Sequence, residues 1–180
     1  IAAQSPIPPN VAGYDENFRN PLLEYNPAKA KALLDQYGYL DRNGDGYRDL
    51  PDGTPFELEQ PSAPTSLDRQ YDELWNKSMN AVGIKIRFKK DKWPELLKQS
   101  RAGKLQMKGS AWSADYPDGD NFLQLLYGPN SGMANDARFD LPAFNEIYRK
   151  ARALPDSPER TKLYQEMTKY VAVYAPWKLG

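Results

Sequence analysis

The feature that most constrains the fold is a change of hydrophobic period at Gly83. Before it, apolar residues recur at helical spacing, at Leu67, Tyr71, Leu74, Trp75 and Val82. After it, apolar and basic residues alternate as in a half-buried strand, with Ile84, Ile86 and Phe88 on one face and Lys85, Arg87 and Lys89 on the other. Because one glycine separates the two patterns, this part of the chain predicts a helix that leads directly into a strand.

The rest of the chain continues this alternation. Asn26 and Pro27 predict the cap and first residue of a helix that ends at Gly38, with an apolar face at Ala30, Leu33, Leu34 and Tyr37. Thr65 or Ser66 predicts the cap of the next helix. Further strands are expected at residues 56–59 and 105–112, a loop at 113–120, and helical segments at 93–101, 121–127, 142–153 and 158–174. The predicted class is therefore α/β, with a mixed sheet flanked by helices.

Composition removes several kinds of chemistry. The chain has 24 Lys and Arg against 24 Asp and Glu, so its net charge is zero. The charge balance therefore gives no indication of a nucleic acid or an anionic membrane as partner. It has no cysteine and no histidine, which excludes disulfides, thiolate metal sites and a Ser-His-Asp triad within these residues. No apolar run approaches the roughly 20 residues that span a membrane, and residues 1–6 lack the basic and apolar regions of a signal peptide. Both ends are expected to be cut from a longer protein.

Four stretches in a fixed order carry a more specific signal. They are Tyr25–Leu34 with Tyr37-Gly38-Tyr39, the segment from Asp41-Arg42-Asn43-Gly44-Asp45-Gly46 to Gly53, Asn80–Ile86, and Trp112-Ser113-Ala114-Asp115-Tyr116-Pro117-Asp118 with Asn121–Tyr127. Phe139–Phe144 adds a fifth, weaker one. In this order and spacing, the chain resembles the peptide- and oligopeptide-binding family of extracytoplasmic solute-binding proteins, the receptors of ABC importers.

The resemblance implies one lobe of a two-lobed, type II periplasmic-binding-protein fold. Residues 1–24 would be a connector from a preceding N-terminal region, and residues 25–180 the distal, C-terminal lobe, truncated before the return crossing. The two lobes would close on a solute and deliver it to an ABC permease. The protein would then be a monomeric, periplasmic or extracytoplasmic binding protein at or near the cytoplasmic membrane, without enzymatic activity or a cofactor. Its own helices and strands are expected to supply the core of this lobe.

The same resemblance indicates a ligand site around Asp115. In peptide-binding members, the aspartate of the Trp-x-x-Asp motif pairs with the α-amino group of the ligand, and Asp115 has that position here. Trp112, Ala114 and Tyr116 are the other expected ligand contacts, with Trp112 as an aromatic wall. Two alternatives stay open: Asp115 as a solvated loop residue, and Trp112 as a core residue.

A second acidic segment has the spacing of a calcium loop. Its positions 1, 3, 5, 6, 9 and 12 are Asp41, Asn43, Asp45, Gly46, Asp49 and Asp52. However, position 12 is an aspartate rather than a glutamate, and the prolines at 51 and 55 break any exit helix. The alternative is a metal-free turn before a strand.

Three rival functions also remain open. A carboxylate pair such as Asp115 and Asp118 could cleave a glycosidic bond. The chain could instead be a calcium-binding or protein-interaction module. Within the family, the ligand could be a nickel complex, haem, an oligosaccharide or an opine rather than a peptide.

Overall fold

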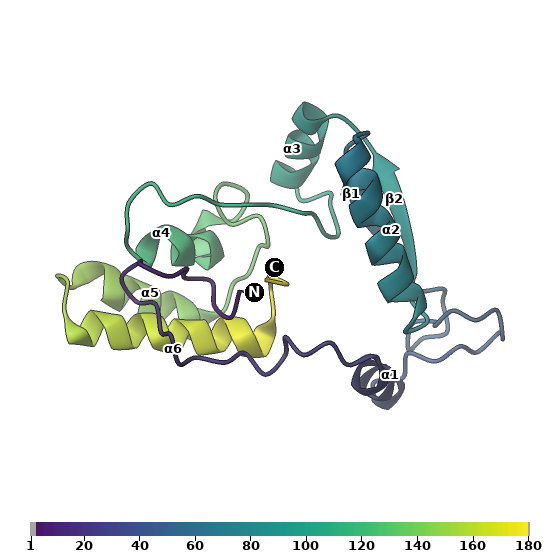
Figure 1. The fold of residues 1–180 in the computed structure, drawn as a ribbon, viewed down its shortest axis with the longest axis horizontal. Coiled ribbons are helices and arrows are strands. Elements are labelled where there is room, and N and C mark those ends of the chain that lie inside the picture. The colour runs from purple at the N-terminus through teal and green to yellow at the C-terminus, as the bar shows by residue number, and fades with distance from the viewer. Residues whose placement is uncertain (1–2, 180) are drawn as a thin grey trace. The chain divides into compact units, whose positions relative to one another are not determined.

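The computed structural model describes residues 3–179, which divide into two compact units. Unit 1 comprises residues 3–24 and 111–179, and unit 2 comprises residues 25–110. Figure 1 draws the chain in colours that run from the N-terminus to the C-terminus. The assignment of residues 1–24 to a connector and of 25–180 to one distal lobe stays a prediction.

Unit 2 begins with helix α1, Pro27–Gln36. The Asn26 side chain accepts a hydrogen bond from the Lys29 N–H at 2.9 Å, as its capping pattern predicts. The expected apolar face of this helix is not buried, however. Leu33 is 43% exposed and Tyr37, just beyond the helix, is 67% exposed.

Two parallel strands and the helix between them form the rest of the unit's framework. Strand β1, Glu57–Ser62, pairs with β2, Lys85–Lys90, so that Glu57 lies opposite Lys85 and Ser62 opposite Lys90. Helix α2, Ser66–Asn80, makes the connection, and the Thr65 side chain caps it. The predicted strands and the helix between them are confirmed. Strand β1 begins one residue later and ends three residues later than predicted, and β2 is shifted by about one residue.

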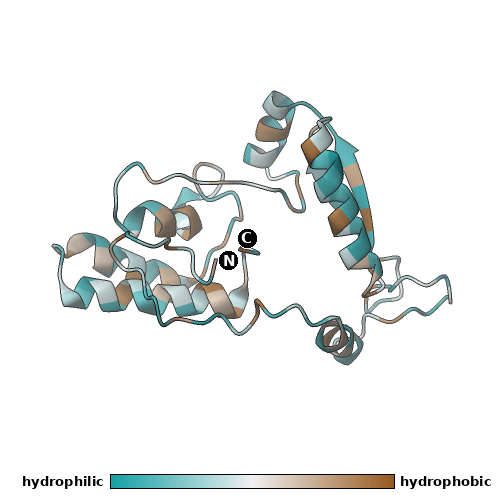
Figure 2. Ribbon diagram, viewed as in Figure 1, coloured by the Kyte–Doolittle hydropathy of each residue, from teal (hydrophilic) through white to brown (hydrophobic). Residues whose placement is uncertain are grey.

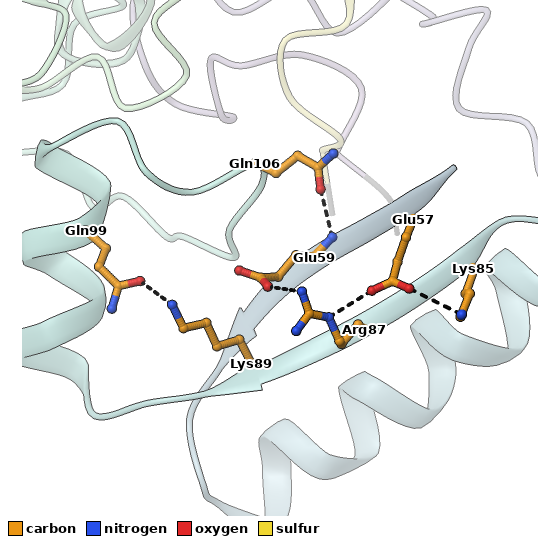
Figure 3. A network of polar contacts seen from close by, with 7 residues as sticks. All are labelled: Glu57, Glu59, Lys85, Arg87, Lys89, Gln99 and Gln106. Carbon is orange, nitrogen blue, oxygen red and sulfur yellow. Dashed lines mark hydrogen bonds and ion pairs between the residues drawn. The ribbon is translucent and has the colours of Figure 1, made fainter. Parts of the chain in front are cut away.

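The two faces of this small sheet differ in polarity, as the alternation of β2 predicts. Ile86 is buried, at 8% exposure. On the other face Arg87 pairs with Glu57 at 2.8 Å and with Glu59 at 2.6 Å, and Lys85 reaches Glu57 at 3.4 Å (Figure 3). Because the Lys85 and Arg87 side chains are 57% and 64% exposed, these ion pairs add little to stability.

The strand expected at residues 105–112 is absent, and that prediction is wrong. The N–H of Glu59 in β1 instead donates to the side-chain oxygen of Gln106 at 2.7 Å (Figure 3). A side chain therefore satisfies this donor of β1, where a third strand would have used its backbone. Within the described residues the sheet has two parallel strands and is not the mixed sheet we expected. Helix α3, Trp93–Arg101, forms as predicted.

Unit 1 is built on two long helices. Helix α5 is Pro142–Ala153 and α6 is Pro158–Tyr174, both as predicted, and they pack side by side (Figure 1). The short α4, Asp120–Leu123, and the 3-10 turns η1, Gln124–Leu126, and η2, Gly128–Asn130, complete the unit. Its buried core is Ile7, Leu123, Leu126, Phe144, Ile147, Tyr148, Ala151, Tyr164, Met167 and Val171. No helix among residues 3–179 is long and apolar enough to cross a membrane.

The N-terminal segment is an integral part of unit 1. Ile7 is 1% exposed in the core, and the Gly119 N–H donates to the Ala12 carbonyl at 2.9 Å. A Cβ at Gly119 would lie 2.8 Å from that carbonyl oxygen, which explains the glycine. The segment therefore packs directly on the loop that precedes α4.

Gly128 offers a direct test of this packing. Its N–H donates to the Asn145 side chain at 2.8 Å, and a Cβ added there would overlap the Asp140 carboxylate and lie 2.7 Å from Asn145 Nδ2. We expect Gly128→Ala to lower the free energy of unfolding by about 1–3 kcal/mol in urea titrations, because the site cannot take another carbon. Gly109→Ala is the control, since no atom lies within 4 Å of its Cβ position. Equal effects of the two substitutions would contradict the packing described.

Candidate functional site

The predicted motif lies in unit 1, and one buried amide organises it. Asn121 in α4 is 0% exposed, and its side-chain oxygen accepts the indole N–H of Trp112 at 2.8 Å. The same oxygen accepts the Asp115 N–H at 3.3 Å, and the Asn121 amide nitrogen donates to the Asp115 carboxylate at 3.3 Å. The structure therefore brings Trp112 and Asp115 together through Asn121.

Sequence reasoning missed this role of Asn121. The pattern favoured Asn121 and Phe122 as the start of a helix, where they are found, over a role in the site. The signal present in the sequence was an amide side chain at position 121, six residues after Asp115 and nine residues after Trp112. Spacing in the chain alone does not reveal that contact, because it depends on how the loop folds back.

Asp115 itself is exposed. Its only described contact is the neutral amide of Asn121, and no lysine or arginine among the described residues forms an ion pair with it. A carboxylate that is oriented but not neutralised can accept a cationic N–H group. The arrangement excludes the possibility that Asp115 turns into the interior of the unit to pair with a basic residue.

The other predicted ligand contacts are also exposed. Trp112 is 46% exposed and Tyr116 is 44% exposed, so Trp112 is not a core residue of this structure. Ala114 lies between them in the same exposed segment. The Tyr116 hydroxyl donates to the carboxylate of Asp120, the first residue of α4, at 2.8 Å.

Asp118 has the opposite environment from Asp115. One of its carboxylate oxygens pairs with Arg160 of α6, and the other accepts the Tyr164 hydroxyl at 2.7 Å and the Asp120 N–H at 2.8 Å. Burial opposes ionisation, but these hydrogen bonds and the guanidinium outweigh it and hold the pKa of Asp118 below its ordinary value of 3.8. Because both oxygens are occupied, Asp118 does not form with Asp115 the free carboxylate pair that glycoside cleavage requires.

Asp120 acts on two neighbouring phenols. Burial first, and the Asp120 carboxylate second, raise the pKa of Tyr116 and of Tyr148 above the ordinary value of 10.0. Both phenols therefore stay protonated at neutral pH, and the Tyr116 hydroxyl is the donor to Asp120. One oxygen of Asp120 is buried without a hydrogen-bond partner.

In the calcium-like loop of unit 2, the side-chain oxygens accept hydrogen bonds from the loop's own backbone N–H groups. Asp41 accepts the Gly44 and Gly46 N–H groups at 2.8 and 2.9 Å, and Asn43 accepts the Asp45 N–H at 2.8 Å. The remaining three acidic side chains accept loop donors in the same way, namely Asp45, Asp49 and Asp52. No group of three or more metal-ligating side chains that could hold an ion occurs within residues 3–179. This geometry favours the metal-free turn.

The environment of Asp118 predicts a specific pH dependence. Its folded pKa is depressed, so its stabilisation is present above the unfolded pKa near 3.8 and is lost as the pH falls below that value. We expect Asp118→Asn to destabilise the protein at pH 7 and to have a smaller effect at about pH 3, measured by urea unfolding. Asp156→Asn, an exposed acid before α6, is the matched control. An Asp118→Asn effect of the same size at both pH values would contradict the assignment.

Comparison with known proteins identifies the family to which the chain belongs. The profile of bacterial extracellular solute-binding proteins, family 5, matches residues 1–134. The chain is 32% identical over 179 residues to di/tripeptide-binding protein 2 of Pseudomonas aeruginosa, and the match covers 97% of this chain and 31% of that protein. It is 31% identical to heme-binding protein A of Haemophilus influenzae, over 98% of this chain and 30% of that protein.

Solved structures show the same fold. The periplasmic binding protein DppA of Helicobacter pylori, in complex with the peptide STSA, matches with a TM-score of 0.82 and 27% identity over 99% of this chain and 32% of that one. The oligopeptide-binding protein AppA of Bacillus subtilis matches with a TM-score of 0.87 at 21% identity, over 99% and 36%.

These matches confirm the predicted class, α/β, and its relation to two-lobed periplasmic binding proteins. The chain spans about 31% of the length of the relative with which it shares 32% identity. The resemblance read from the four sequence stretches is also confirmed: the chain belongs to the bacterial extracellular solute-binding proteins of family 5.

Proposed function

We propose that these residues are part of the receptor of an ABC importer, which captures peptides or related amine-bearing solutes. The observation that carries the proposal is the exposed, oriented and unneutralised carboxylate of Asp115. Relatives that are named for binding di- and tripeptides support it.

Asp115 would bind the ligand's α-amino group. A cation that leaves water needs an opposite charge and good hydrogen-bond geometry, and a held carboxylate provides both. Asn121 supports this role because it fixes the carboxylate without neutralising it. Trp112 would contact the ligand with its exposed ring, while Tyr116 and Ala114 would line the same segment.

The wider biology follows from the same proposal. The ligand-loaded receptor would dock on a membrane permease and act outside the cytoplasmic membrane, in the periplasm or an equivalent space. We propose a binding role without catalysis, because the chain has no histidine or cysteine and Asp118 is held in an ion pair. A monomer without a cofactor is sufficient for this function.

Haem is a weaker candidate ligand, although one relative is named for it. Haem iron is commonly held by histidine, cysteine, methionine or tyrosine side chains. The present chain has neither histidine nor cysteine, so an imidazole or thiolate ligand would have to come from elsewhere. The open carboxylate of Asp115 favours an amine over an iron porphyrin.

Asp115→Asn in the full-length protein tests the amine contact. We expect the affinity for peptides with a free amino terminus to fall about 10- to 100-fold in calorimetric titrations, as for the loss of a charge-assisted hydrogen bond. N-acetylated peptides should already bind weakly to the unmodified protein and should lose little more. Glu146→Gln, an exposed acid on α5, is the control. Equal binding of free and acetylated peptides by the unmodified protein would refute the amine contact.

Residues 1–180 alone should bind peptide weakly. The ion pair at Asp115 would stay hydrated and screened in an open site, where exposed pairs contribute about 0–1 kcal/mol. We therefore expect a dissociation constant weaker than about 1 μM, the value that corresponds to about −8.2 kcal/mol. A micromolar or tighter constant, measured by calorimetry on the purified chain, would contradict this expectation.

A further inference from the structure

Asn121 is a fully buried polar residue. It is 0% exposed and lies in α4 beside Phe122 and Leu123, which are also buried, so that this short helix carries both hydrophilic and hydrophobic positions (Figure 2). Burying an amide costs free energy unless hydrogen bonds replace those that it makes with water. The partners of the Asn121 side chain therefore show what the amide is for.

Those partners lie in the exposed segment that we propose to bind the ligand. The Asn121 side-chain oxygen accepts the Trp112 indole N–H at 2.8 Å, and its amide nitrogen donates to the Asp115 carboxylate at 3.3 Å. The amide also contacts Tyr116: burial and the Asp120 carboxylate raise the pKa of this phenol, whereas a hydrogen bond from Asn121 lowers it. One buried side chain thus contacts each polar or aromatic member of the expected ligand site.

The Asn121 amide has a single favourable orientation. Its oxygen faces two N–H donors, the Trp112 indole at 2.8 Å and the Asp115 backbone at 3.3 Å, while its nitrogen faces a carboxylate. A rotation that exchanged the amide oxygen and nitrogen would set donor against donor and acceptor against acceptor. The Trp112 indole N–H therefore helps to keep the amide nitrogen turned toward the Asp115 carboxylate.

The backbone of Asn121 is fixed to the rest of unit 1. Its N–H donates to the Asp118 carbonyl at 3.1 Å, and its carbonyl accepts the Gln124 side-chain nitrogen at 3.3 Å. Leu123, two residues later, is 0% exposed in the core. The core thus holds the amide, and the amide in turn holds two side chains at the surface.

These two side chains are close together. Because each is hydrogen-bonded to the same amide, the Trp112 indole nitrogen and the Asp115 carboxylate oxygen lie within about 9 Å of each other. Each residue of an extended peptide spans about 3.3–3.6 Å. The first residues of a ligand whose amino group binds Asp115 can therefore reach the Trp112 ring.

We propose that Asn121 is a positioning residue that makes the amine contact at Asp115 and the aromatic contact at Trp112 form as one unit. The inference rests on the proposed function, and it adds that the two contacts are energetically coupled. Asn121 does not touch the ligand, because it is fully buried. It holds the carboxylate and the indole in place before the ligand arrives, which reduces the entropy that binding costs.

Asn121→Leu in the full-length protein removes both hydrogen-bonding groups and keeps a side chain of similar size. Calorimetry measures the dissociation constants of trialanine and of N-acetyltrialanine, and the ratio of the acetylated to the free value is called here the amine preference. We expect Asn121→Leu to reduce the amine preference about tenfold, as for the loss of a hydrogen bond to a charged group.

The matched control is Asn145→Leu. Asn145 is also a buried amide of unit 1, but its side chain accepts the Gly128 N–H and donates to the Asp140 carboxylate. Its loss therefore removes hydrogen bonds of the same kind away from the ligand segment. We expect the amine preference of Asn145→Leu to stay within about twofold of the unmodified value.

Trp112→Phe tests the coupling in a protein that keeps the Asn121 amide. Phenylalanine retains an aromatic ring but has no N–H to donate to Asn121. We expect Trp112→Phe to reduce the amine preference about threefold or more, although the indole does not bind the amine. In the Asn121→Leu background the same substitution should leave the amine preference within about twofold, since the link is already lost.

The outcomes separate this inference from the function on which it rests. Equal binding of the two peptides by the unmodified protein would refute the amine contact itself. A clear amine preference that Asn121→Leu retains would overturn the positioning role alone. An equal effect of Trp112→Phe with and without the Asn121 amide would contradict the coupling. If circular dichroism shows that Asn121→Leu does not fold, an amine preference left unchanged by Trp112→Phe would overturn the proposal.

Discussion

The ionised carboxylate of Asp118 holds the candidate site together. It binds Arg160 and Tyr164 of α6, and in doing so fixes the loop before α4 on the helical core of unit 1. Gly119 then packs against Ala12 of the N-terminal segment, so that two distant parts of the chain meet at this loop. A charge pair that is largely removed from solvent is costly to break, because each partner would be left buried and alone. The loop is therefore a fixed platform on which a ligand contact can be built.

Three aspartates within six residues have three different environments. Asp118 is neutralised by a guanidinium, Asp120 accepts a phenol, and Asp115 is held only by a neutral amide. Of the three, only Asp115 combines solvent exposure with a defined orientation and no cationic partner among the described residues. Asp118 and Asp120 are thus used within the structure, whereas Asp115 is available for the ligand contact that we propose. The same division explains why this run of acids, within residues 3–179, does not constitute a catalytic pair or a metal site.

Local signals predicted most of the elements, and contacts between distant residues explain what they missed. The caps Asn26 and Thr65 could be predicted from the sequence, because each accepts a hydrogen bond from the backbone N–H three residues later. The strand expected at residues 105–112 failed because a strand also needs a backbone partner, and the Gln106 side chain took the place of one. The apolar face expected for α2 is present as a sequence pattern, but Leu67, Tyr71 and Leu74 on it are more than half exposed. The role of Asn121 was hidden, since it arises only when the loop folds back.

The most direct measurement of the central claim is a crystal structure of the full-length protein with a bound tripeptide. The account predicts that the ligand's α-amino nitrogen lies about 2.7–2.9 Å from the Asp115 carboxylate, with the hydrogen bond between Asp115 and Asn121 retained. A ligand whose amino group binds a different acidic residue, or is left in solvent while Asp115 makes no contact with it, would contradict the account.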